Sequence, residues 1–146
     1  MEFLKFGLPS VLNDKGKVDT AINGGDGYIY FGTVGGALVR LDPKTTEIKM
    51  LGKPSSKGRM TGLARSSEGL LYGVVGDDND VKLFTYDTEN ERFRDMVQLY
   101  NRENGISPVR IHHIVMTKDD VIYAGENDNN TRPGYLWECR IKKERV

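Results

Sequence analysis

One pattern occurs three times in this chain, and it constrains the fold more than any other feature. The copies are KVDTAINGGDGYIYFG (17–32), RMTGLARSSEGLLYGV (59–74) and RIHHIVMTKDDVIYAG (110–125), which align without a gap. Each copy starts with a basic residue, has an acidic residue at a central turn and carries a tyrosine near its end. Ile, Val, Leu and Tyr flank Gly, Asp, Ser and Lys, which predicts two short strands joined by a polar turn. We therefore expect an array of similar β units.

Each unit continues beyond this hairpin. A third strand is predicted at ALVRLD (37–42), KLFTYD (82–87) and YLWECR (135–140), where apolar and polar residues alternate. A fourth follows in the first two units, at EIKMLG (47–52) and RFRDMVQL (92–99). No helical period of useful length appears anywhere in the sequence. The chain is expected to be all-β, built from four-stranded antiparallel units.

The third unit ends without a fourth strand, and the N-terminal sequence offers one. FLKFGLPS (3–10) is similar to IKMLGKPS (48–55), with Gly, Pro and Ser at matching positions. We expect residues 1–10 to hold a displaced fourth strand that completes the last unit. The predicted units are 17–52, 59–99 and 110–146, within one domain that covers residues 1–146.

Four-stranded antiparallel units at about 40 to 50 residue spacing resemble the blades of a β-propeller. The sequence has no Trp-Asp blade ending of the WD40 type and no paired glycines at the kelch position, and it is most similar to the diverse sugar-lactonase and polysaccharide-lyase propellers. Propellers have about four to eight blades, so three cannot close a ring. We expect a homodimer that forms a six-bladed ring, in which each N-terminal strand finishes the last blade of the partner. Two alternatives stay open: the chain is part of a longer propeller, or its sheets form an open solenoid or a sandwich.

Composition excludes several kinds of partner. Lys plus Arg and Asp plus Glu number 21 each, so no overall charge attracts nucleic acid or an acidic membrane. Apolar runs are far shorter than the roughly 20 residues that a bilayer span needs, and the N-terminus lacks the sections of a signal peptide. The single cysteine, Cys139, cannot form an internal disulfide. These features favour a cytoplasmic location.

The resemblance implies a ligand site at one mouth of the central channel, on the side formed by the loops that enter the innermost strands and those that join second strands to third. Basic residues recur at that side, and a ring of them would attract an anionic small molecule or glycan. The alternative is that they pair with acids of adjacent loops. The predicted ligand-binding residues are Lys17, Arg59, Arg110, Asp77, Asp78, Glu126, Asn127, Asp128 and Arg132.

Two acidic loops and one histidine indicate further kinds of chemistry. The loops GDDND (76–80) and GENDNNTRPG (125–134) are rich in the oxygen ligands that calcium prefers, although neither has the spacing of an EF-hand loop. The same residues are typical of ordinary turns, and we expect no cofactor. His112 is the candidate catalytic residue, because a histidine beside Arg110 could act as a general base. The first functional hypothesis is a binding module, and the alternative is a lyase- or lactonase-like enzyme that uses His112 with Arg59 and Arg110 or a loop-bound divalent metal.

Overall fold

The computed structural model describes residues 1–3, 16–127 and 129–141, and every regular element in those ranges is a β-strand. The first sheet contains β1 (Val18–Asn23), β2 (Ile29–Thr33), β3 (Leu38–Leu41) and β4 (Ile48–Gly52). The second contains β5 (Met60–Arg65), β6 (Leu71–Val75), β7 (Lys82–Asp87) and β8 (Arg92–Gln98). The third contains β9 (Arg110–Met116), β10 (Val121–Asn127) and β11 (Leu136–Arg140). We call these sheets blades 1, 2 and 3.

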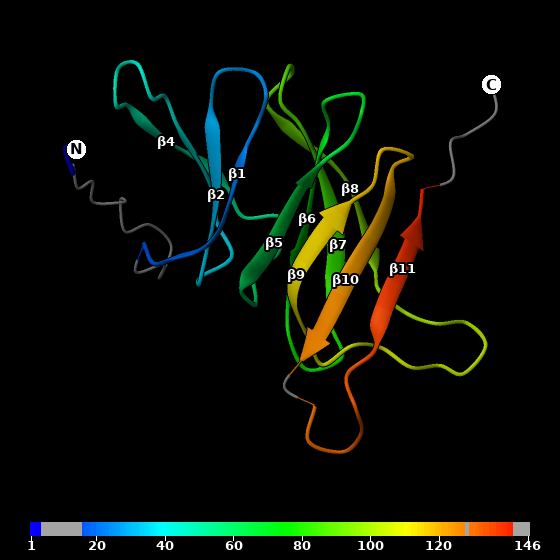
Figure 1. The fold of residues 1–146 in the computed structure, drawn as a ribbon. Helices are drawn as coiled ribbons and strands as arrows, with labels where there is room; N and C mark the ends of the chain where they lie inside the picture. The colour runs from blue at the N-terminus through cyan, green and yellow to red at the C-terminus, as the bar shows by residue number, and fades with distance from the viewer. Residues whose placement is uncertain (4–15, 128, 142–146) are drawn as a thin grey trace.

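Within each blade, strands that follow one another in the sequence lie side by side and run antiparallel. The blades succeed one another in space as they do in the chain, with β5 packed between β1 and β9 (Figure 1). This arrangement confirms the predicted all-β architecture of propeller blades. The predicted N-terminal strand falls mainly on residues 4–15, which lie outside the described residues, and the six-bladed homodimer stays a prediction.

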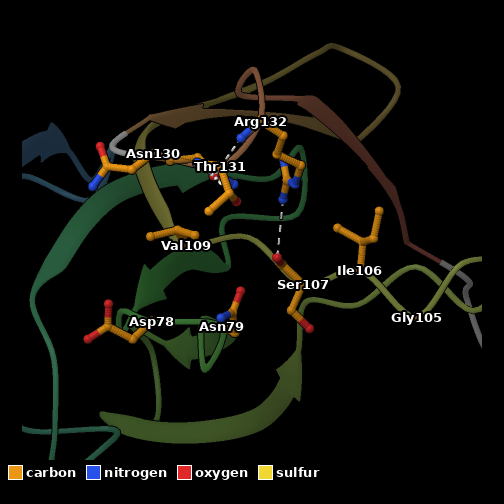
Figure 2. Close-up of a pocket in the computed structure, with 10 residues that line it drawn as sticks. Asp78, Asn79, Gly105, Ile106, Ser107, Val109, Asn130, Thr131 and Arg132 are labelled. Atoms are coloured by element: carbon orange, nitrogen blue, oxygen red, sulfur yellow. Dashed lines mark hydrogen bonds between the residues drawn. The ribbon is translucent and has the colours of Figure 1, made fainter.

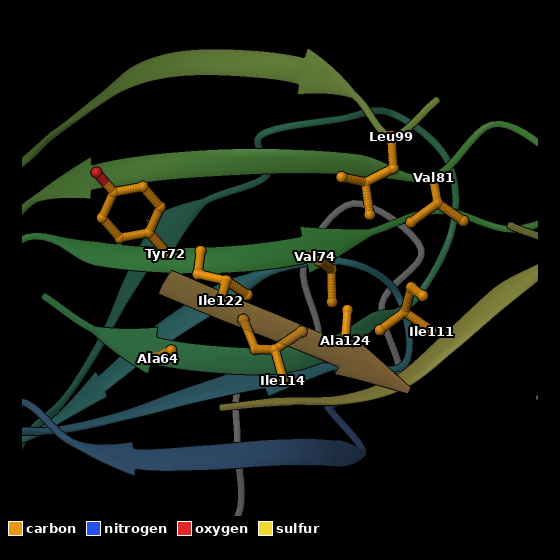
Figure 3. Close-up of a cluster of buried hydrophobic side chains, with 9 residues drawn as sticks. All are labelled: Ala64, Tyr72, Val74, Val81, Leu99, Ile111, Ile114, Ile122 and Ala124. Carbon is orange, nitrogen blue, oxygen red and sulfur yellow. The ribbon is translucent and has the colours of Figure 1, made fainter. Parts of the chain in front are cut away.

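Two apolar clusters hold the blades together, one at each boundary. The cluster between blades 1 and 2 contains Tyr30, Leu38, Met60, Leu63, Leu71, Val75, Phe84 and Tyr86. The cluster between blades 2 and 3 contains Ala64, Tyr72, Val74, Val81, Leu99, Ile111, Ile114, Ile122 and Ala124 (Figure 3). Side chains on a strand alternate between its two faces, so blade 2 contributes one face to each cluster. Burial of apolar area between sheets therefore stabilises a stack and not three separate cores.

The innermost strand of every blade carries a β-bulge at the same position of the repeat. The pairing of β1 with β2 skips Asp19, that of β5 with β6 skips Thr61, and that of β9 with β10 skips His112. A bulge bends its strand and redirects the side chain of the extra residue. Three equivalent bulges therefore place Asp19, Thr61 and His112 at one end of the inner strands.

Cys139, the single cysteine of the chain, is partly buried. Cys139 lies on β11 and packs at the edge of the cluster between blades 2 and 3, where burial raises the pKa of its thiol. This position indicates a packing role for Cys139, because the thiolate and not the thiol is the reactive form. No helix in the described ranges is long and apolar enough to span a membrane.

Candidate functional site

The two groups of loops that the sequence assigns to one side of the molecule do meet there. Val34, in the loop after β2, donates its N–H to the Lys17 carbonyl at 2.8 Å, and Gly76, after β6, donates to the Arg59 carbonyl at 3.0 Å. Asp78 donates its N–H to the Val109 carbonyl at 2.8 Å. We call this end of the blades the loop face. These bonds tie the loops after β2 and β6 to the segments that start the inner strands.

Two of the three recurring cations of the loop face, Arg59 and Arg110, are paired with acids. Arg59 donates from Nε and Nη2 to the two carboxylate oxygens of Asp19 at 2.7 and 2.8 Å. Arg110 donates from Nε to Asp77 at 2.7 Å. Each of these pairs joins one blade to the blade before it. Lys17 is exposed and forms no ion pair with another described residue.

These pairs lower the positive potential that the recurring basic residues were expected to produce. The bidentate pair of Arg59 with Asp19 uses the Nε and Nη2 edge of the guanidinium and matches its charge, which weakens its attraction for an anionic ligand. The geometry is the one described by the alternative reading, in which basic residues pair with acids of neighbouring segments. An anion site at the channel mouth therefore stays a prediction, with two of its three cations already neutralised.

A cavity of about 520 Å³ opens on the loop face between blades 2 and 3 (Figure 2). Three segments enclose it: the loop after β6, the long connection from β8 to β9, and the loop after β10. Its lining residues are Asp78, Asn79, Gly105, Ile106, Ser107, Val109, Asn129, Asn130, Thr131 and Arg132. We call this cavity the interblade pocket. Its size falls in the range of about 300 to 1,000 Å³ that is typical of small-molecule sites.

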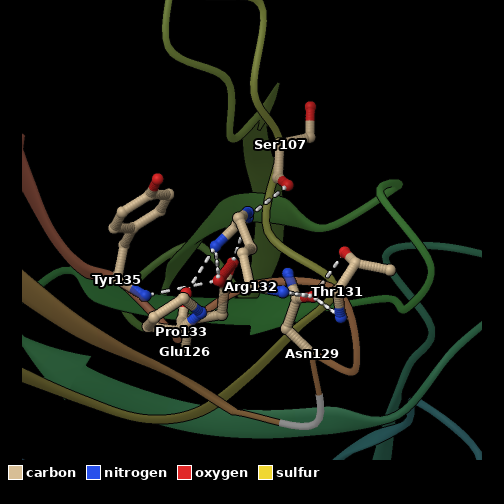
Figure 4. Close-up of polar contacts among 7 residues, drawn as sticks. All are labelled: Ser107, Glu126, Asn129, Thr131, Arg132, Pro133 and Tyr135. Atoms are coloured by element: carbon tan, nitrogen blue, oxygen red, sulfur yellow. Dashed lines mark hydrogen bonds and ion pairs between the residues drawn. The ribbon is translucent and has the colours of Figure 1, made fainter.

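Arg132 organises one wall of the interblade pocket (Figure 4). Its guanidinium binds both carboxylate oxygens of Glu126 and reaches the carbonyls of Pro133 at 3.0 Å and Ser107 at 3.4 Å. It also lies over the Tyr135 ring, 4.2 Å from the ring centre. The Arg132 side chain therefore connects the loop after β10 to the β8–β9 connection, and its charge is already matched.

Glu126 is the buried half of this pair, with a side chain that is 0% exposed. Burial raises the pKa of this carboxyl, whereas the Arg132 guanidinium and the Tyr135 N–H lower it and prevail, so the pKa lies below its usual value. Glu126 therefore stays ionised and anchors the wall.

The groups that remain for a ligand are mostly neutral and polar. The backbone at Asp78 and Asn79 has φ of 52° and 66°, respectively. This is the left-handed conformation, which Asp and Asn tolerate better than most residues. The Asp78 carboxylate forms no ion pair with another described residue. Asn129 is occupied, because its Oδ1 accepts from Thr131 and from the Arg132 N–H. The pocket therefore offers a carboxylate, amides and a hydroxyl, beside the apolar side chains of Ile106 and Val109.

The other predicted site residues are spread over the loop face. Asn127 is exposed at the end of β10, and Asp128 lies outside the described residues. His112 is exposed at the bulge of β9. A second cavity, of about 430 Å³, lies along the inner strands β1, β5 and β9. Within residues 1–3, 16–127 and 129–141, no three His, Cys, Asp or Glu side chains come together as a metal site.

Sequence reasoning missed part of the interblade pocket. Asn79 and Asn130 lie in the loops 76–80 and 125–134, but they are not among the predicted ligand-binding residues. Ser107, Ile106 and Val109 come from the β8–β9 connection, which is not part of the repeat. The polar segment NRENG (101–105), which separates two units, was the available signal for a longer loop.

Comparisons with known proteins give the fold and nothing finer. No protein-family model and no curated protein matches the sequence. Among solved structures, the extracellular domain of a putative one-component system from B. thetaiotaomicron matches at 18% identity and a TM-score of 0.60, over 88% of this chain and 16% of that one. The Swd1 β-propeller domain of Myceliophteria thermophila matches at 14% identity and a TM-score of 0.55, over 91% of this chain and 40% of that one.

A luciferin-regenerating enzyme matches at 14% identity and a TM-score of 0.55, over 84% of this chain and 45% of that one. The chain thus spans less than half the length of each of these three proteins. At such low identity the likeness concerns architecture alone, since one fold carries many functions. Together with the three stacked antiparallel sheets, it shows that this chain has the fold of a β-propeller domain.

Proposed function

We propose that this chain is a binding module that recognises a glycan, and that the interblade pocket is the ligand site. The observation that carries the proposal is the lining of the pocket: the Asp78 carboxylate, the Asn79 and Asn130 amides and the Ser107 hydroxyl surround an open volume of about 520 Å³. A sugar presents hydroxyls that both donate and accept hydrogen bonds. An amide side chain can both donate to and accept from such hydroxyls, and a carboxylate is a strong acceptor.

The proposal favours a ligand without a strong negative charge. Arg132, the cation in the pocket lining, is bound to Glu126, and Asp78 would repel a uronate or a phosphate placed beside it. At the channel mouth, Arg59 and Arg110 are held by Asp19 and Asp77. A neutral sugar hydroxyl is not repelled by Asp78 and does not need an unpaired cation. Ile106 and Val109 add an apolar patch against which the C–H face of a sugar ring can pack.

The test is isothermal titration calorimetry with a panel of neutral and uronate-containing oligosaccharides. We expect at least one neutral oligosaccharide to bind, and Asp78→Asn to weaken it about tenfold, because a hydrogen bond to a charged acceptor is worth roughly 1.5 to 3 kcal/mol. Asn is compatible with the left-handed backbone at position 78, so this variant should fold. Asn130→Ala, which removes one exposed amide, should weaken binding by a similar or smaller factor.

Glu89→Gln is the matched control, because it removes a carboxylate from an exposed turn of blade 2 that does not line the pocket. Binding should be unchanged in this variant. The proposal is wrong if no neutral oligosaccharide binds, or if Asp78→Asn and Asn130→Ala both leave the affinity unchanged. The same mixtures should be analysed for products. Turnover that disappears in His112→Ala would favour the enzyme alternative.

A further inference from the structure

Blade 3 ends the described stack with a face that shares a tyrosine, a glycine and a leucine with a face that is buried elsewhere in the molecule. In each blade a tyrosine of the second strand and a leucine of the third point toward the following blade. In blade 1 these are Tyr30 and Leu38, both 0% exposed and both in the cluster with blade 2. In blade 3 the equivalents are Tyr123 and Leu136, and Leu136 is 72% exposed. Blade 3 therefore has the surface of an inner blade without a following blade among the described residues.

Blade 1 presents the opposite half of such a boundary. The inner strand of each later blade inserts two apolar side chains into the blade before it. Met60 and Leu63 enter the cluster with blade 1, while Ile111 and Ile114 enter the cluster with blade 2. The equivalent residues of blade 1 are Val18 and Ala21, and both are exposed, Val18 by 50%. An apolar pair that is buried at two boundaries is thus left uncovered at the third.

At one position, blade 3 has open space where the first boundary is filled. At the boundary of blades 1 and 2, the Met60 side chain fills the space over Gly32, so a Cβ on Gly32 would lie 2.6 Å from Met60 Cγ. Gly125 occupies the position of Gly32 in blade 3, and it has nothing within 4 Å of where a Cβ would stand. Val18 holds the position of Met60 in blade 1. A blade that begins with Val18 can therefore fill the space over Gly125 as Met60 fills that over Gly32.

The cations at the starts of the inner strands show the same difference between the internal boundaries and the open face of blade 1. Arg59 and Arg110 start their inner strands, and each binds an acid of the preceding blade. Lys17 starts the inner strand of blade 1 and forms no ion pair with another described residue. Blade 1 therefore presents an apolar pair and a cation, which are the two features that the internal boundaries direct toward a preceding blade.

We propose that a second copy of this chain supplies the missing neighbour: blade 1 of each copy packs on blade 3 of the other. The two contacts are related by a two-fold axis, so every open face is covered and the assembly closes. Two copies give six blades, within the range of about four to eight that propellers have. This inference is independent of the ligand proposed above, since the interblade pocket lies wholly between blades 2 and 3 of one copy.

The first measurement is the mass of the 146-residue chain by light scattering after size-exclusion chromatography. We expect twice the 16.4 kDa of one chain. Leu136→Asp and Val18→Asp should each give a monomer, because each variant places a charge in both contacts of the ring. Both positions are exposed in the single chain, so a normal circular dichroism spectrum is expected. Val97→Asp is the matched control, because Val97 is 61% exposed on the outermost strand of blade 2 and the ring leaves it uncovered.

Mixing the two monomeric variants separates loss of the contact from loss of the fold. Blade 3 of Val18→Asp and blade 1 of Leu136→Asp are both unaltered, so these two chains can form one intact contact, whereas neither variant can do so with itself. We expect the mixture to contain a heterodimer that is weaker than the wild-type dimer. The proposal is overturned if the wild-type chain is monomeric or forms open polymers, if Val97→Asp dissociates the dimer as completely as Leu136→Asp, or if the mixed variants stay apart.

Discussion

Gly58→Ala is expected to lower the free energy of unfolding by about 4 kcal/mol, a combined effect of backbone strain and steric overlap. Gly58 has φ of +90°, in the left-handed region that disfavours any Cβ. A Cβ at this position would also lie 2.3 Å from the Cα of Gly76, in the loop after β6. Because that neighbour is backbone, no side-chain rotation relieves the overlap. Urea denaturation followed by circular dichroism measures the loss.

Gly69→Ala is the control that isolates the contact from the conformation. Gly69 has φ of +86°, close to that of Gly58, and nothing lies within 4 Å of where its Cβ would stand. We expect Gly69→Ala to lower the free energy of unfolding by only the cost of the left-handed backbone conformation, about 1 to 2 kcal/mol. Equal losses in the two variants would contradict the view that close backbone approach at Gly58 holds the β4–β5 connection against the loop after β6.

The sequence predicted the strands well because the repeat shows the same signal three times. The third strand of the second unit, predicted at KLFTYD (82–87), matches β7 (Lys82–Asp87), and the predicted fourth strand at 92–99 differs from β8 (Arg92–Gln98) by one residue. Alternation of apolar and polar residues repeats in every unit, so a strand that is weakly indicated in one copy is still indicated by the other copies. Strand pairing within each blade then follows from the short polar turns.

The β-bulges could not be predicted in the same way, because a bulge is a difference of register between two strands. Asp19, Thr61 and His112 share a position in the repeat, but apart from being polar they have different charge, size and shape. No residue type marks the extra position, and alternation that is interrupted by one residue is hidden in strands this short. The bulges matter for the site, because the bulged residue Asp19 is the one that receives Arg59.

The pairing of charges is a second property that the sequence left open. Several acids lie within loops near Arg110 and Arg132, and spacing along the chain does not rank them. The folded chain selects Asp77 for Arg110 from a loop of blade 2, and Glu126 for Arg132 from the end of its own hairpin strand. Arg132, predicted as a ligand-binding residue of the channel mouth, lines the interblade pocket, and its pairing with Glu126 makes it a support for the pocket wall.

Glu126 and Arg132 support the wall of the interblade pocket. Glu126→Gln should lower the free energy of unfolding by about 2 kcal/mol at neutral pH, because it removes a buried acceptor of charge-assisted hydrogen bonds and leaves Arg132 without its counter-charge. The loop after β10 should become more accessible to protease, since Arg132 links it to the Ser107 carbonyl. Chemical denaturation and limited proteolysis measure the two effects, and Glu89→Gln serves again as the exposed control.

The effect of Glu126→Gln on stability should depend on pH, whereas an ordinary loss of packing would not. The pKa of Glu126 is lowered in the folded protein from a usual value of 4.5, so the unfolded chain takes up the proton first as the pH falls. The ion pair therefore stabilises the fold fully above about pH 4.5, and that contribution declines as the pH falls through the lower, folded-state pKa. The difference in stability between wild type and Glu126→Gln should shrink below pH 4.5. A difference that stays constant down to pH 3 would show that Glu126 acts through its shape and not through its charge.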